Sequence, residues 1–149
     1  MTIEPLTVAD LEHAAQFGAA FYAETGMPRT FEPARFVAIW TELYRVGMGV
    51  ILGIEVDGEL VGALAAMVAP GIYDGQTEAQ ECFIYIRPEF RDRGCFQPLL
   101  AAYEAWADAQ GAVEKRIACM EGNRPEALER VYRRLGYVPL ERHYIKKVT

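Results

Sequence analysis

Apolar residues in the first third of the chain recur at the spacing of amphipathic helices. In residues 8–25, Leu11, Ala14, Phe17 and Phe21 fall close to the helical period, which predicts a first helix there. A second helix is predicted to begin at Glu32-Pro33, because proline is tolerated in the first turn of a helix. Its apolar face is formed by Phe36, Ile39, Trp40, Leu43 and Tyr44.

The middle of the chain changes to the patterning of strands. The segment "GVILGIEVDGELVGALAAMV", residues 49–68, has two runs rich in β-forming residues on either side of Asp57-Gly58. This pair suits a type I′ turn and therefore predicts an antiparallel hairpin. After a loop over residues 70–78, residues 79–88 form a further predicted strand, which stops at Pro88.

The second half predicts strands and helices in alternation. A helix over residues 95–111 ends at Gly111, a strand covers 114–120, a helix covers 125–136, and a last strand covers 137–148. The whole order is β-α-α-β-β-β-α-β-α-β. The strand–helix–strand unit requires a parallel pair with a right-handed crossover, whereas the hairpin requires antiparallel neighbours. We therefore expect one α/β domain over residues 1–149, built on a mixed sheet.

Composition narrows the class of protein. The 149 residues are 52% hydrophobic and 24% charged, as expected for a globular domain. A formal net charge of −6 disfavours nucleic-acid binding, which needs a broad basic surface. The three cysteines and two histidines lack metal-site spacing, so no metal is expected. Without a signal peptide or an apolar run long enough for a membrane helix, we expect a cytoplasmic protein with no membrane partner.

The turn "EFRDRG", residues 89–94, is the main candidate for binding chemistry. It lies between a predicted strand and a predicted helix, where unpaired N–H groups and the helix dipole favour an anion. Arg91 and Arg93 add positive charge, and Gly94 lets the backbone approach a ligand closely. These features suit a diphosphate. A solvated, arginine-rich turn is the alternative.

Two segments resemble the motifs of the GNAT superfamily of N-acetyltransferases. The first is "FIYIRPEFR" with Arg91-x-x-Gly94 and the following Leu99-Leu100, and the second is "NRPEALERVYRRLGY". The resemblance is to short bacterial or bacteriophage members. It implies a mixed sheet of about six strands with about four helices, in which an antiparallel hairpin leads into a splayed parallel pair.

The resemblance also implies a site for acetyl-CoA between the splayed strands. The pantetheine arm would follow the strand, and the backbone of the turn would hold the diphosphate. The implied cofactor-binding residues are Ile84, Tyr85, Ile86, Arg91, Asp92, Arg93, Gly94, Cys95, Phe96, Asn123 and Tyr132. Two features depart from the family pattern. Phe96 replaces a small residue, and Pro98 removes one amide from the first helical turn.

The implied reaction is the attack of an amine on the thioester, which needs a base and an acid. Tyr132 is the candidate acid, with a core tyrosine as the alternative. Glu81 and Glu121 are candidate bases, and a water chain is the alternative. Strand alternation places Glu81 on the face of Phe83 and Tyr85. The candidate acceptor pocket contains Phe21, Tyr22, Glu24, Met27, Arg29, Tyr73 and Asp74.

The resulting prediction is an acetyl-CoA-dependent N-acetyltransferase acting on a primary amine. The acceptor is either a small molecule or an amine of a protein, and a homodimer is left open. The alternative is a GNAT-fold protein that binds CoA, or no longer does, and serves as a sensor or interaction module. Phe96 and Pro98 are the residues that favour this alternative.

Overall fold

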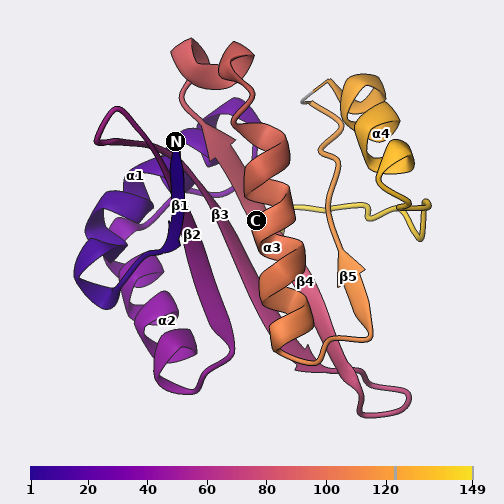
Figure 1. The fold of residues 1–149 in the computed structure, drawn as a ribbon. Coiled ribbons are helices and arrows are strands. Elements are labelled where there is room, and N and C mark those ends of the chain that lie inside the picture. Colours follow the sequence, from indigo (N-terminus) through magenta and orange to yellow (C-terminus); the bar gives the residue numbers. More distant parts are fainter. Residues whose placement is uncertain (123, 149) are drawn as a thin grey trace.

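A five-stranded mixed sheet forms the centre of the protein (Figure 1). The structure is a computed structural model that describes residues 1–122 and 124–148. The first four strands are antiparallel neighbours, and the fifth pairs in parallel with the fourth. In spatial order the strands are β1 (Thr2–Pro5), β2 (Gly49–Val56), β3 (Glu59–Pro70), β4 (Thr77–Ile86) and β5 (Glu114–Arg116).

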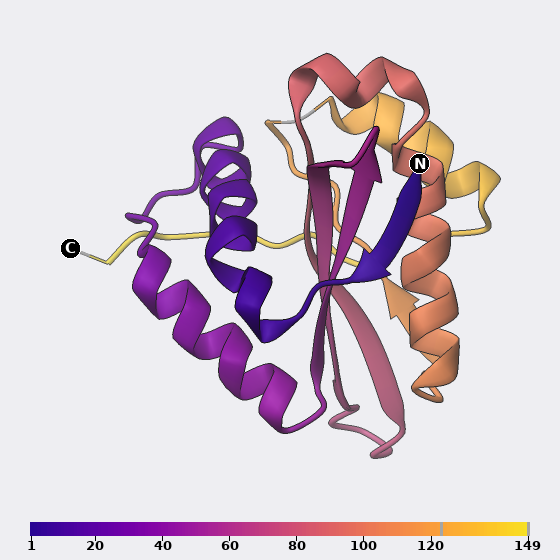
Figure 2. The ribbon, with the colours of Figure 1, turned by 60° about the vertical axis from the view of Figure 1, so that its left-hand side comes forward.

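Helices cover both faces of the sheet (Figure 2). α1 (Leu11–Glu24) and α2 (Pro33–Arg45) pack on one face, and α3 (Phe96–Ala109) packs on the other. α4 (Pro125–Arg134) lies beyond β5, and two short 3₁₀ helices are η1 (Val8–Asp10) and η2 (Pro88–Arg93). Within the described residues, no helix combines the length and apolar character needed to cross a bilayer.

Most of the predicted elements are confirmed, because their signals are local. The two hairpin residues Asp57 and Gly58 have φ angles of 52° and 77°, as a type I′ turn requires. The helices begin and end within a few residues of the predicted bounds. The α/β fold with a hairpin leading into a parallel pair is therefore as expected.

A β-bulge at Cys82 corrects the predicted facing of Glu81. In the pairing of β3 with β4, Ala65 lies opposite Phe83 and Ala66 lies opposite Glu81, which leaves Cys82 unpaired. An extra residue shifts the alternation of side chains between the two faces. The Phe83 ring packs against α1 and α2, whereas the Glu81 carboxylate accepts a hydrogen bond from beyond β5. The shared face predicted for these two residues is therefore wrong.

The parallel pair is short and ends just before this bulge. β4 and β5 are paired only from Glu78 opposite Glu114 to Gln80 opposite Arg116. The strand predicted over residues 114–120 ends at Arg116 in the structure, and the segment that follows it diverges from β4. The last predicted strand is a second correction: residues 137–148 are described and contain no strand, so the sheet has five strands rather than about six.

Candidate active site

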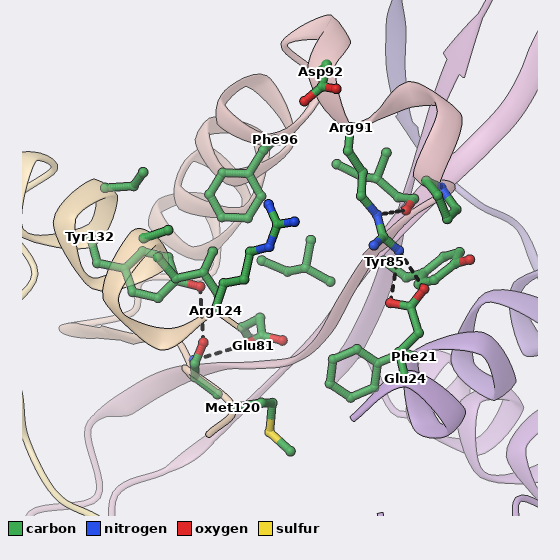
Figure 3. A pocket seen from close by; sticks show the side chains of 17 residues that line it. Phe21, Glu24, Glu81, Tyr85, Arg91, Asp92, Phe96, Met120, Arg124 and Tyr132 are labelled. Carbon is green, nitrogen blue, oxygen red and sulfur yellow. Dashed lines mark hydrogen bonds and ion pairs between the residues drawn. The ribbon is translucent and has the colours of Figure 1, made fainter. Parts of the chain in front are cut away.

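The opening between β4 and the chain after β5 contains a cavity of about 500 Å³ (Figure 3). Its walls come from α1, the end of β4, η2, the start of α3, the segment after β5, and α4. They are formed by Phe21, Glu24, Glu81, Ile84, Tyr85, Ile86, Pro88, Arg91, Asp92, Phe96, Ala118, Met120, Arg124, Ala127, Leu128, Val131 and Tyr132. A mainly apolar wall with a few polar groups is typical of a small-molecule site.

Glu81 is a buried carboxyl group in the wall of this cavity. Its side chain is only 4% exposed, and its Oε2 accepts a hydrogen bond from Ala118 N–H at 2.9 Å. This contact replaces the strand pairing that is lost where β4 and β5 diverge. Burial raises the pKa of Glu81 to about 7, against a usual value of 4.5, and the Ala118 bond lowers it only in part. A carboxyl group with this pKa can accept a proton near neutral pH.

Tyr132 approaches the same residue, Ala118, from α4. Its hydroxyl donates to the Ala118 carbonyl oxygen at 3.0 Å, and its ring is buried. Glu81 therefore binds the N–H group of Ala118, and Tyr132 binds the C=O group of the same residue. Burial, followed by the nearby Glu81 charge, raises the pKa of Tyr132 above its usual value of 10. The phenol is thus a proton-bearing hydrogen-bond donor at neutral pH.

The N-terminus of α3 presents consecutive free amides. The N–H groups of residues 94–97 have no hydrogen-bond acceptor within the described part of the chain, and the first helical bond runs from Leu99 N–H to the Cys95 carbonyl oxygen. Gly94 has a φ of 71°, which is the conformation that turns η2 into α3. Pro98 follows the free amides, so its missing N–H removes none of them. The predicted effect of Pro98 on this turn is therefore small.

The Arg91 side chain faces α1 rather than the free amides (Figure 3). Its Nε donates to the Ile86 carbonyl oxygen at 2.7 Å, and one terminal nitrogen binds both Glu24 oxygens at 2.8 and 2.9 Å. Its guanidinium also lies over the Tyr85 ring. Arg91 therefore ties the end of α1 to the end of β4. Its predicted phosphate contact would require the side chain to leave these partners.

We expect Arg91→Ala to raise the KM for the acceptor about three- to tenfold, with a smaller change in the Kd for CoA. The reason is that Glu24 and Phe21 of the cavity wall lose their tie to β4, while the amides of residues 94–97 remain. The exposed ion pair contributes at most about 1 kcal/mol, so the fold should persist. Steady-state kinetics and CoA titration measure the two constants.

Arg45→Ala is the matched control, because Arg45 is an exposed arginine whose ion pair with Glu42 lies on α2, outside the described cavity wall. It should change neither constant by more than about twofold, as expected for a surface ion pair. A large loss of CoA affinity in Arg91→Ala with an unchanged KM for the acceptor would instead assign Arg91 to the phosphates.

The other predicted coenzyme residues fall into two groups. Ile84, Tyr85, Ile86, Asp92 and Phe96 line the cavity, as predicted for a ligand between the strands. Arg93 and Gly94 are not among the described lining residues, Cys95 is buried in the core, and the Asn123 prediction lies outside the described residues. The Phe96 ring lies 6.3 Å from the Tyr132 ring, between α3 and α4, and leaves the cavity open.

Fewer of the predicted acceptor residues meet at the cavity. Phe21 and Glu24 line it, but Tyr22, Met27, Arg29, Tyr73 and Asp74 are not among the described lining residues. Tyr73 is 95% exposed in the β3–β4 turn. The second candidate base, Glu121, is exposed and also lies outside the described lining. The geometry thus separates Glu81 from Glu121.

Arg124 is a cavity residue that the sequence analysis missed. It precedes α4 with a φ of 46°, an uncommon conformation for a residue with a side chain, and its guanidinium points into the cavity (Figure 3). Met120 and Ala118 were also missed. The signal available was their place in the chain: they follow the parallel strand at its carboxyl end, where α/β sheets form their ligand sites.

Comparison with known proteins bears on this geometry. Residues 11–137 match the family described as "Acetyltransferase (GNAT) family". Three similar solved structures each share 20% sequence identity with this chain. A probable acetyltransferase has a TM-score of 0.79, and the match covers 100% of this chain and 99% of that one. AAC(6')-Iy in complex with the bisubstrate analog CoA-S-monomethyl-acetylneamine has a TM-score of 0.77, with 99% and 97% covered, and ribosomal-protein-alanine N-acetyltransferase from Brucella melitensis biovar Abortus 2308 has a TM-score of 0.72, with 99% and 100% covered. At this identity the likenesses show the fold. No curated protein matches the chain by sequence.

Proposed function

Because this chain belongs to the GNAT acetyltransferase family, we propose that it transfers an acetyl group from acetyl-CoA to a primary amine. The observation that carries the proposal is the cavity in which Glu81 and Tyr132 both bind the backbone of Ala118. A base and a hydrogen-bond donor are groups that direct acyl transfer from a thioester requires, and the free amides at the start of α3 suit the coenzyme.

The described residues fit the coenzyme. Beyond Gln80, the edge of β4 that faces the cavity has no strand partner, so its backbone suits the two amides of a pantetheine arm. The free amides of residues 94–97 suit the diphosphate. Arg124 supplies a guanidinium at the same cavity. The coenzyme would supply the activated thioester and the leaving thiol.

Glu81 is the proposed general base. It takes a proton from the attacking amine as the new N–C bond forms and the C–S bond breaks. Its pKa near 7 leaves a substantial ionised fraction at neutral pH, while a usual carboxyl would be a weaker base. Tyr132 is proposed to turn away from the Ala118 carbonyl and to donate a hydrogen bond to the leaving sulfur.

The acceptor proposed is a primary amine that carries further positive charge, from a small molecule or from a protein, and its attacking amino group is neutral. The net charge of −6 favours the approach of a cation. The solved structure of AAC(6')-Iy is a complex with an acetylneamine bisubstrate analog, so an aminoglycoside is a reasonable member of a first acceptor panel.

Two measurements test the proposal. CoA and acetyl-CoA should each raise the Tm, and release of thiol from acetyl-CoA should depend on an added amine. Stabilisation without turnover across a broad panel of amines would favour the alternative, a CoA-binding sensor. Absence of any stabilisation would overturn the enzyme and leave the form of the alternative that no longer binds CoA. The open cavity beside Phe96 favours the enzyme.

A further inference from the structure

One arginine in the cavity wall has no ion-pair partner. The described wall contains three acids, Glu24, Glu81 and Asp92, and two arginines, Arg91 and Arg124. Arg91 is paired with Glu24, whereas Arg124 forms no ion pair within residues 1–122 and 124–148. A guanidinium that points into a cavity without a carboxylate partner is available to an anionic ligand.

The two arginines of the turn before α3 are engaged away from the free amides. Arg91 donates to the Ile86 carbonyl oxygen and to Glu24. The Arg93 guanidinium lies 4.8 Å from the centre of the Phe90 ring. A diphosphate on the amides of residues 94–97 would therefore receive no side-chain cation from this turn, although acids outnumber arginines in the described wall.

Arg124 reaches the cavity from the opposite wall. It is the residue immediately before α4, with φ and ψ angles of 46° and 57°. Figure 3 shows its side chain extending into the cavity on the side of Phe96, the first residue of α3. The Phe96 ring lies 6.3 Å from the Tyr132 ring of α4, so the two helices approach each other at this end of the cavity. Arg124 is therefore placed to complete an anion site that α3 begins.

Arg124 is also joined to α4 through its backbone. Its carbonyl oxygen accepts hydrogen bonds from Ala127 N–H at 3.1 Å and from Leu128 N–H at 3.3 Å, which form the first turn of the helix. Among the described residues of α4, only Tyr132 is buried. Since helices depend mainly on the packing of an apolar face, this helix is weakly held by its own side chains. A ligand bound to Arg124 would add an attachment at its first turn.

We propose that Arg124 binds the diphosphate of the coenzyme and thereby fastens α4 to the start of α3. This inference rests on the proposed function, because it needs the coenzyme in the cavity. The amides of residues 94–97 hold the diphosphate from one side, and the guanidinium donates two parallel hydrogen bonds from the other. Because α4 carries Tyr132, binding of the coenzyme orders the helix that bears the proposed hydrogen-bond donor.

The first test measures the Kd of CoA and of dephospho-CoA by calorimetry in Arg124→Ala. Dephospho-CoA keeps the diphosphate and lacks the ribose 3′-phosphate. Arg124→Ala should raise both Kd values about tenfold or more, as expected for the loss of charge-assisted hydrogen bonds. Arg130→Ala is the matched control, since Arg130 is an exposed arginine of α4 outside the described cavity wall. It should change neither Kd by more than about twofold.

Hydrogen exchange gives a second readout that does not depend on turnover. Saturating CoA should slow the exchange of α4 amides in the wild-type chain and in Arg130→Ala. In Arg124→Ala, also saturated with CoA, the same amides should exchange nearly as fast as without ligand. The substitution should not disturb the fold, because alanine and arginine both carry a β-carbon and are equally strained at a φ of 46°.

Four results would overturn the inference while the proposed function stands. The first is equal CoA affinity in Arg124→Ala and Arg130→Ala. The second is a loss for CoA but not for dephospho-CoA, which would assign Arg124 to the 3′-phosphate. The third is a raised KM for the acceptor with both Kd values unchanged, which would assign Arg124 to a carboxylate of the acceptor. The fourth is equal protection of α4 by CoA in both variants. If the wild-type chain binds neither probe, the proposed function fails as well.

Discussion

Glu81→Gln is expected to lower kcat about 100-fold or more and to remove the acidic limb of the kcat–pH profile. A positioned general base contributes about 10²- to 10⁴-fold to a rate, and glutamine cannot accept the proton. In the wild-type enzyme, kcat should fall as the pH decreases below about 7, because the Glu81 carboxylate becomes protonated there. Measurement of kcat with saturating amine across this pH range checks both expectations.

The same substitution should also change how the free energy of unfolding depends on pH. The pKa of Glu81 is about 7 in the folded protein and near 4.5 when unperturbed, so the folded state binds the extra proton between these values. The stability that this group contributes is present below pH 4.5 and is lost as the pH rises through 7, an effect of about 3 kcal/mol. Glu81→Gln should therefore be less sensitive to this pH change in chemical unfolding.

Glu78→Gln is the matched control, since Glu78 lies earlier in β4 and pairs with Arg116 at 3.3 Å, outside the described cavity wall. It should retain kcat and its pH profile. If Glu81→Gln kept the acidic limb, the base would be another group. If its kcat were unchanged, Glu81 would be only a structural link to Ala118.

The position of Glu81 shows what the sequence could not predict. Its place in a strand followed from residue patterning, but its facing depends on the bulge at Cys82, which exists only in the pairing of β4 with β3. A pattern within one strand contains no information on its partner's register. The turn before α3 was predictable because glycine, arginines and a helix start are local signals.

Two features depend on contacts that the sequence did not indicate. The Arg91 guanidinium pairs with Glu24, a residue distant in sequence that no local pattern connects to it. Residues 137–148 have the period of a strand, yet a strand forms only where a sheet edge accepts it. Contacts between distant segments therefore decide both features.

The raised pKa of Tyr132 bears on how it would assist the leaving group. Burial and the Glu81 charge move the pKa of the phenol above its usual value of 10, further from that of a thiol, which is about 8.5 for cysteine. Full transfer of the proton to a thiolate would therefore be unfavourable. A hydrogen bond from the hydroxyl to the developing thiolate stabilises the transition state without that cost.

Tyr132→Phe should accordingly lower kcat about 10- to 100-fold while the KM for acetyl-CoA changes little. A hydrogen bond to a charged group contributes about 1.5 to 3 kcal/mol, and this one forms fully only as the C–S bond breaks. Tyr137→Phe is the matched control: its ring lies 6.0 Å from Tyr132, and it loses one hydrogen bond to Glu104 outside the described cavity wall. Comparable kcat values for the two variants would remove Tyr132 from the reaction. A rise in KM at constant kcat would make it a binding residue, because its hydroxyl would then act equally before and during bond cleavage.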